Sequence, residues 1–81
     1  MVKVALWGTL QAAADNQAEV EVEAKDVREL LRHLATAYPG LKPQIARGVS
    51  VSIDGLIYAN TLTAKIKPDS EVVLLPRLVG G

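Results

Sequence analysis

Hydrophobic and polar residues alternate near the N-terminus in the way that a β-strand with one buried face requires. Within residues 2–7, every second residue from Val2 to Leu6 is apolar and falls on one face. Residues 18–24 alternate similarly, with three glutamates on one side, which is typical of an antiparallel strand with one face in water. The segment between them contains Gly, Asp and Asn, so we expect a turn over 8–17 that joins a hairpin.

An amphipathic helix is predicted next. Apolar residues recur at intervals of three and four and form one stripe, which comprises Val27, Leu30, Leu31, Leu34 and Tyr38. Asp26 precedes the stripe as a candidate N-cap, and Glu29 stands three residues later, at the spacing of a capping box. Pro39-Gly40 should end the helix, because proline disfavours helical geometry in the residue before it.

The second half of the chain predicts three further strands, over 49–53, 56–59 and 71–75. Asp54-Gly55 is a strong indicator of a hairpin turn, and Pro68 suits the second position of a type I turn. Residues 41–48 contain Pro43 and are expected to form a loop. Pro76 should end the pairing of the last strand, because it has no N–H to donate.

This order of elements predicts an α+β protein with the β-grasp (ubiquitin-like) arrangement. In that fold one main helix packs on one face of a mixed sheet, and the first and last strands lie parallel at its centre. We expect a single domain over residues 1–75, followed by a C-terminal tail over 76–81.

Composition narrows the functional classes. The 81 residues include nine acidic and nine basic side chains, whereas nucleic-acid-binding proteins normally carry a basic surplus. The absence of Cys excludes disulfides, thiolate metal sites and a cysteine nucleophile, and His33 has no second His beside it, so solvated helix surface is expected there. No apolar run approaches the length of a signal peptide or a membrane span, so we expect a cytoplasmic protein.

The last residues are Leu-Pro-Arg-Leu-Val-Gly-Gly, so the sequence ends on Gly80 and Gly81. Two terminal glycines arise by chance in roughly 0.5% of chains at a glycine frequency of about 7%. A frayed polar terminus is the plain alternative, but Leu78 and Val79 are apolar and would serve no purpose in a solvated tail.

The sequence resembles the ubiquitin-like sulfur carriers, which include the small subunit of molybdopterin synthase and the thiamine sulfur carrier. The resembling segments run through the whole chain: Leu6-Trp7-Gly8, Val27-Arg28-Glu29-Leu30-Leu31, Tyr38-Pro39, Pro68-Asp69-Ser70-Glu71-Val72, Leu75-Pro76 and Gly80-Gly81. The length favours the molybdopterin branch. The tail differs from many relatives at 77–79, where they carry a second Pro and small residues, so a thiamine-type or other biosynthetic pathway stays open.

The resemblance implies a carrier that acts with separate enzymes and binds no cofactor stably. An E1-like adenylyltransferase would activate Gly81 with ATP and magnesium, and a persulfide donor would supply sulfur to give a thiocarboxylate. The molybdopterin synthase large subunit, or an equivalent acceptor enzyme, would then receive the sulfur. The residue types suit this chemistry, because an α-carboxylate is ionised at neutral pH and glycine has no Cβ to obstruct a partner's active site. Residues 76–81 reach about 20 Å when extended.

A docking surface for these partners is predicted beside the tail. If Val2, Val4 and Leu6 face the helix, then Ala5 and Trp7 face away from it, together with Val73 and Leu75 of the last strand. Exposed apolar patches are usually interaction sites. The residues expected to bind partners are Trp7, Val73, Leu75, Pro76, Arg77, Leu78 and Val79. We expect Arg77 to pair with a partner carboxylate. The alternative for Trp7 is an ordinary core position over the end of the sheet.

A rival function shares the same fold and tail. The chain could be a ubiquitin-like protein modifier or interaction module, conjugated through Gly81 to lysines or docking through its sheet alone. Thiocarboxylate at Gly81 would favour sulfur transfer, whereas isopeptide-linked adducts would favour protein modification.

Overall fold

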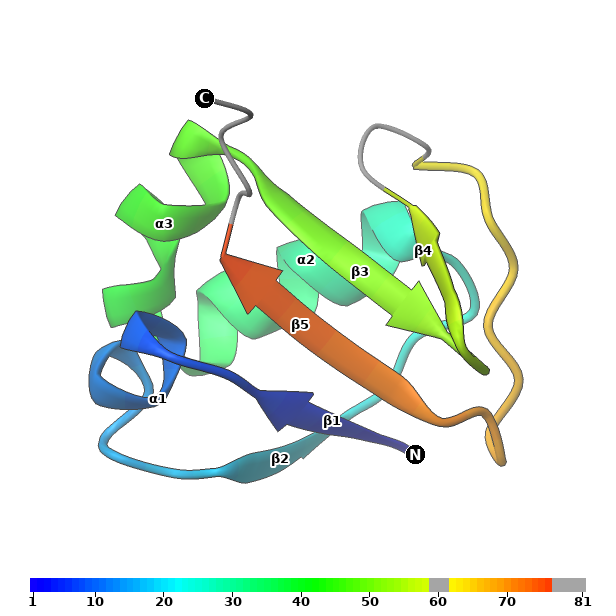
Figure 1. Ribbon diagram of the computed structural model, residues 1–81, viewed down its shortest axis with the longest axis horizontal. Coiled ribbons are helices and arrows are strands. Elements are labelled where there is room, and N and C mark those ends of the chain that lie inside the picture. The colour runs from blue at the N-terminus through cyan, green and yellow to red at the C-terminus, as the bar shows by residue number, and fades with distance from the viewer. Residues whose placement is uncertain (59–61, 77–81) are drawn as a thin grey trace.

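One five-stranded sheet organises the molecule (Figure 1). The computed structural model describes residues 1–58 and 62–76. The strands follow the order β2-β1-β5-β3-β4 across the sheet. They are β1 (Val2–Leu6), β2 (Glu19–Val22), β3 (Val49–Ile53), β4 (Leu56–Tyr58) and β5 (Val72–Pro76). β1 and β5 pair in parallel at the centre and the other neighbours are antiparallel, so the predicted β-grasp fold is confirmed.

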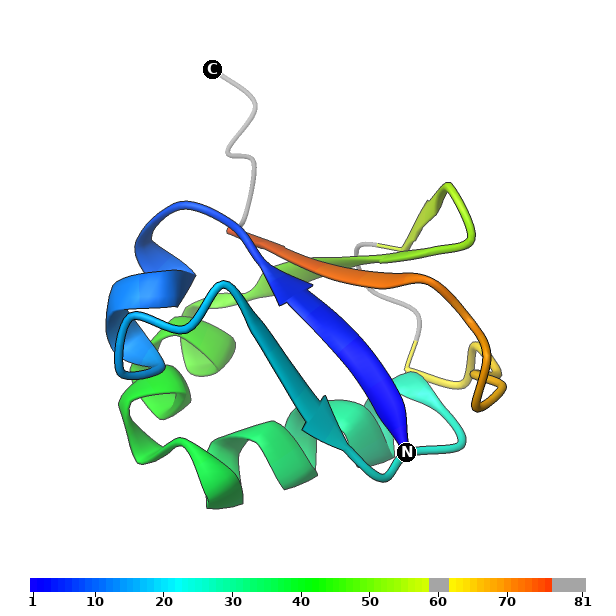
Figure 2. The ribbon, with the colours of Figure 1, turned by 90° about the horizontal axis from the view of Figure 1, so that it is seen from below.

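The helical elements of the described residues all lie on the same face of the sheet (Figure 2). They are α1 (Thr9–Ala13), α2 (Val27–Ala37), the 3-10 turn η1 (Pro39–Leu41) and α3 (Lys42–Arg47). α2 runs beneath the sheet and carries the predicted apolar stripe, of which Leu30 and Leu34 are fully buried. None of the helices in the described part of the chain is long and apolar enough to span a bilayer.

The core lies between α2 and the inner faces of the strands. Val4, Leu6 and Leu74 have no exposed surface, as the alternation along the first and last strands predicts. Leu10 and Leu41, from segments expected to be irregular, are equally buried. The core therefore extends past the end of the sheet, where the short helices close it.

The N-terminus of α2 is capped as the sequence predicts. Asp26 has an extended backbone, and its Oδ1 accepts a hydrogen bond of 2.8 Å from the backbone N–H of Glu29. This bond satisfies one of the amides that the first helical turn leaves without a partner. The helix ends at Ala37, just before Tyr38 and Pro39, so both predicted boundaries hold within one residue.

The Asp26 cap of α2 leads to a testable prediction. Asp26→Ala should lower the free energy of unfolding by about 1 kcal/mol, because the Glu29 amide loses its acceptor. Asp26→Asn keeps a side-chain oxygen and should lose much less. Urea denaturation with unchanged m values measures both variants. An equal loss in the Ala and Asn variants would show that the cap contributes nothing.

The segment between β1 and β2 differs from the sequence prediction. A turn was expected over 8–17, but a short helix, α1, occupies its first half. No side chain caps α1; instead Leu10 anchors it in the core. Asp15 and Asn16 then turn the chain with φ of 56° and 61°, a conformation that Asn and Asp tolerate well.

The prediction of a loop over 41–48 is also wrong, because η1 and α3 occupy this region. Pro39 and Pro43 stand in the first turns of these elements, where the missing N–H costs nothing. Gly40 makes the arrangement possible: a Cβ there would collide with the carbonyl oxygen of Ala13. α1 and η1 therefore meet only because position 40 has no side chain.

The turn between β3 and β4 and the end of β5 can also be set against the sequence prediction. Asp54 and Gly55 both have positive φ and join β3 to β4 as a tight hairpin, as predicted. The last strand runs one residue further than expected: Pro76 is the final residue of β5 and stands in register with Val49 of β3. A proline at the end of a strand still offers its carbonyl, so only the donor is missing.

Candidate functional site

The bare outer face of the sheet carries a row of side chains across all five strands. Register places Glu19, Ala5, Val73, Ser52 and Ile57 side by side, in the order of the strands. The middle of this row is small or apolar, and no helix of residues 1–58 and 62–76 lies on this side (Figure 2). Outward Val73 and inward Val72 and Leu74 agree with the predicted alternation of the last strand.

Trp7 is the largest exposed side chain at the tail end of this face. Its side chain is 57% exposed, so the alternative of an ordinary core position is wrong. Its backbone N–H donates a 3.2 Å hydrogen bond to the carbonyl of Leu74, which extends the pairing of β1 with β5. This bond places the backbone of Trp7 beside the end of β5, where Leu74 is followed by the half-buried Leu75.

The described part of the predicted docking patch is thus assembled in one place. Trp7, Val73, Leu75 and Pro76 come from the two central, parallel strands and their ends. Arg77, Leu78, Val79, Gly80 and Gly81 lie outside the described residues. The patch meets the tail at Pro76, because β5 ends there and residues 77–81 follow directly.

Gly8 also belongs to this site, although the sequence analysis treated it only as a turn residue. Its backbone has φ of 61° and ψ of −133°, and a Cβ built on it would lie 3.4 Å from Cγ of Pro76. A side chain at position 8 would therefore be in ordinary van der Waals contact with Pro76, the last residue of β5. The only sequence clue is a glycine directly after the predicted strand 2–7, which does not reveal what it faces.

The acidic strand β2 borders the apolar patch. Glu19 and Glu21 are exposed, and their register partners on β1 are Ala5 and Lys3. Charged side chains at every second position of an edge strand discourage pairing with the edge of another sheet. The patch is thus flanked on one side by carboxylates and bordered on the other by Ser50 and Ser52 of β3.

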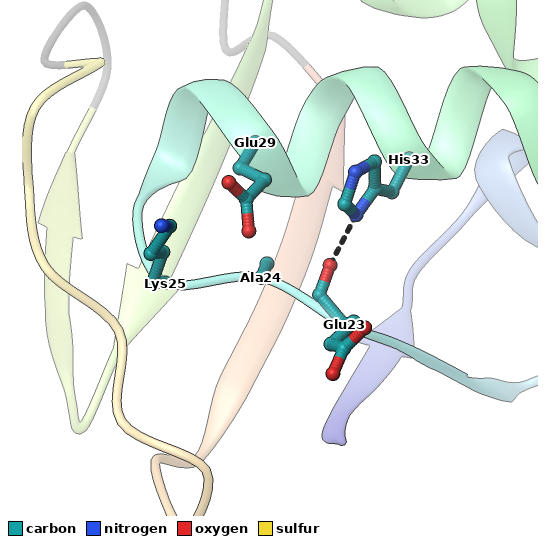
Figure 3. A pocket seen from close by; sticks show the side chains of 5 residues that line it. All are labelled: Glu23, Ala24, Lys25, Glu29 and His33. Carbon is teal, nitrogen blue, oxygen red and sulfur yellow. Dashed lines mark hydrogen bonds between the residues drawn. The ribbon is translucent and has the colours of Figure 1, made fainter.

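A separate depression lies at the other end of the molecule, between α2 and the end of β2 (Figure 3). Its lining residues are Glu23, Ala24, Lys25, Glu29 and His33. His33 Nδ1 donates a hydrogen bond to the carbonyl of Glu23, so this side chain ties α2 to the chain after β2 rather than being simply solvated. Within residues 1–58 and 62–76, no group of three His, Cys, Asp or Glu side chains could hold a metal ion.

Comparison with known families identifies the class of protein. The model of the ThiS family matches residues 4–81, nearly the whole chain. The chain belongs to the ThiS family and is a ubiquitin-like sulfur carrier. No curated protein matches the sequence at a significant level.

Solved structures share the fold over their full length. The solution structure of small archaeal modifier protein 1 from Methanosarcina acetivorans is 26% identical, with a TM-score of 0.81 over 99% of this chain and 95% of that one. The Amycolatopsis orientalis BexX/CysO complex contains a chain that is 20% identical, with a TM-score of 0.79 and complete coverage of both chains. The complex of subunits 1 and 2 of molybdopterin-converting factor from Helicobacter pylori gives 22% identity and a TM-score of 0.68, covering 99% and 97%.

Proposed function

We propose that Gly81 is the working residue of this carrier. An E1-like enzyme adenylates its carboxylate, a persulfide donor supplies sulfur, and the resulting thiocarboxylate is delivered to a separate acceptor enzyme. The observation that carries the proposal is the match of the ThiS family model through residue 81, on a chain that ends in Gly80-Gly81.

The chemical steps need no catalytic group from this chain. A carboxylate oxygen of Gly81 attacks the α-phosphorus of ATP, and pyrophosphate leaves. The terminal sulfur of the persulfide then attacks the carbonyl carbon and displaces AMP, and a thiol cleaves the acyl disulfide to leave the thiocarboxylate. Magnesium and nucleotide belong to the activating enzyme. The carrier contributes a terminus without a Cβ, which can enter a narrow active site.

For the acceptor, we propose the large subunit of molybdopterin synthase. The support is the likeness of this chain, over nearly its whole length, to a chain of the Helicobacter pylori molybdopterin-converting factor complex. That complex joins two different subunits, as a carrier that docks on a separate enzyme would. A thiamine-type or other biosynthetic acceptor is the alternative within the same chemistry.

A second function has its own support. The likeness to small archaeal modifier protein 1, at 26% identity, favours conjugation of Gly81 to lysines of other proteins. Both functions begin with adenylation of the same carboxylate, so they differ only in the nucleophile that displaces AMP. A sulfur nucleophile gives the thiocarboxylate, and a lysine amine gives an isopeptide bond.

The intact mass of the protein tests the proposal directly. The chain is purified from its own host, or incubated with ATP, magnesium, an E1-like enzyme and a persulfide donor. The C-terminal fragment is also sequenced, because oxidation of Met1 or Trp7 adds nearly the same mass as replacing oxygen by sulfur. Sulfur on Gly81 supports the carrier role. Isopeptide adducts without sulfur would support the modifier instead.

Docking through the outer face is tested at Trp7. Trp7→Ala should weaken binding to the activating enzyme by about 30-fold, because an exposed tryptophan at the centre of an interface commonly contributes about 2 kcal/mol. Ile57→Ala is the matched control, since Ile57 lies on the same face with 60% exposure but on the edge strand β4. It should change affinity less than about threefold. Titration calorimetry with folded variants measures both. Unchanged affinity for Trp7→Ala would eliminate the docking role.

A further inference from the structure

We propose that the hydroxyl of Ser50 is a hydrogen-bonding group of the docking surface, at the β3 border of the patch around Trp7 and Leu75. The enzyme that docks there supplies the hydrogen-bond partner that this hydroxyl does not find among the described residues of its own chain. The inference rests on the proposed function, because it concerns the partner that activates Gly81, and it adds the chemistry that this partner must present.

Ser50 lies on the outer face of the sheet. β3 alternates between apolar residues that belong to the core and two serines, Ser50 and Ser52, which fall on the opposite face. Register places Ser50 beside Leu75 of β5, one residue before the end of that strand. The hydroxyl therefore adjoins the apolar patch at the end of β5 that leads into residue 77.

The Ser50 side chain is nearly buried and makes no hydrogen bond. Its exposed fraction is only 6%. Within residues 1–58 and 62–76, no group accepts a hydrogen bond from its hydroxyl or donates one to it. No fully buried side-chain oxygen of these residues lacks a partner, so the Ser50 oxygen retains a small opening to the surface. The hydroxyl is shielded from most of the solvent but can be reached by a group from outside.

Ser70 shows the contrasting case of a buried serine with a structural role. It is 9% exposed, and its Oγ accepts a 3.0 Å hydrogen bond from the backbone N–H of Lys67. The carbonyl of Lys67 accepts another from the backbone N–H of Ser70, so this serine closes the turn before β5. The hydroxyl of Ser50 contributes no such bond to the fold, which leaves contact with another molecule as the role that we assign to it.

Docking makes the Ser50 hydroxyl a selective contact. A partner that covers the patch excludes the remaining water, so the hydroxyl is then either bonded to the partner or unsatisfied. An unsatisfied buried polar group weakens binding by roughly 5- to 150-fold. A surface that presents a carbonyl, carboxylate, amide or hydroxyl opposite Ser50 is therefore preferred over a wholly apolar surface of the same shape.

The acidic border on β2 adds a charge requirement for the same partner. Glu19 is exposed and stands opposite Ala5, and no described residue forms an ion pair with it. Glu21, in contrast, stands opposite Lys3. The partner thus presents an apolar centre, a hydrogen-bonding group toward β3 and a basic side chain toward Glu19. Because the two borders differ in chemistry, they favour one orientation of the docked carrier.

The test makes the same change at the two buried serines. Binding of the full chain to the host's E1-like enzyme is measured by titration calorimetry, and stability by thermal unfolding. Ser50→Ala should raise Kd about tenfold and leave the melting temperature within about 3 °C, because its hydroxyl bonds only to the partner. Ser70→Ala should leave Kd unchanged and lower the melting temperature by about 4–8 °C, because the Lys67 amide loses its acceptor.

Two further variants separate hydrogen bonding from shape and from charge. Ser50→Cys keeps a side chain of similar size with a much weaker hydrogen-bonding group, so it should bind as weakly as Ser50→Ala. Glu19→Gln should weaken binding about threefold at low salt and not at high salt, because salt screens an exposed ion pair. The loss caused by Ser50→Ala should persist at both salt concentrations, because a neutral hydrogen bond is not screened.

The outcomes distinguish this inference from the proposed function. Wild-type affinity of Ser50→Ala or Ser50→Cys would overturn the hydrogen bond, and so would a fall in melting temperature at Ser50→Ala as large as that at Ser70→Ala. Unchanged affinity of Glu19→Gln at low salt would overturn the basic group on the partner. In each case a wild-type chain that is still adenylated leaves the proposed function standing. A wild-type chain that the enzyme never adenylates would overturn the proposed function itself.

Discussion

Deletion of Gly81 alone should abolish sulfur loading while leaving the folded domain unchanged. The shortened chain still ends in a glycine carboxylate, that of Gly80, so the reacting group is chemically the same. Its reach is shorter by about 3.5 Å, the span of one extended residue. Misplacement by even about 1 Å can lower a rate by about 100-fold, so we expect at least that loss in adenylation.

Two controls make the result specific. Gly81→Ala keeps the reach and adds only a Cβ, so it reports the steric narrowness of the partner's active site apart from distance. Thermal unfolding of both variants should coincide with the wild type. Adenylation of the deletion variant at the wild-type rate would show that the reach of the terminus does not limit the reaction, because the Gly80 carboxylate would then serve equally well.

Leu74→Ala should produce the largest loss of stability of any single truncation on β5. Leu74 has no exposed surface and belongs to a central strand, paired on one side with β1 and on the other with β3. Removing a buried leucine side chain costs about 3–4 kcal/mol, from lost burial and from the cavity left behind. For a domain of this size, that corresponds to a fall in melting temperature of about 15–25 °C.

Leu56→Ala is the matched control for this substitution. Leu56 also lies on a strand, but it is 64% exposed at the edge of the sheet. The same atoms are removed, yet the free energy of unfolding should change by less than about 0.5 kcal/mol. Guanidinium denaturation measures both variants. A similar loss at the two positions would mean that β5 is not the centre of the core.

The sequence predicted the long elements well, because their burial pattern is strongly periodic. The apolar stripe on α2 and the alternation on β1 and β5 each follow from a single buried face. The order of apolar and polar residues in the sequence specifies that face directly. The short helices were missed because five or six residues carry too little periodicity. The buried side chains of Leu10 and Leu41 anchor α1 and η1 in the core, and such tertiary contacts cannot be inferred from local composition.

Part of the site could also be predicted from the sequence. The outward direction of Trp7 and Val73 follows from alternation, and their proximity follows from the parallel pairing of the β-grasp fold. The proximity of position 8 to Pro76 could not be predicted, because it depends on how a turn after one strand meets the end of another. The end of β5 was predicted one residue too early, since the missing N–H of Pro76 does not remove it from the pairing with β3.

The close approach of Gly40 to Ala13 connects two elements that lie far apart in the sequence. Position 40 follows the main helix, yet any side chain there would push against Ala13 and so displace α1. Gly8 is the N-cap of α1, and a Cβ at position 8 would lie 3.4 Å from Cγ of Pro76. A single replaced codon in the middle of the chain would thus disturb a helix that stands far earlier in the sequence and packs beside β5.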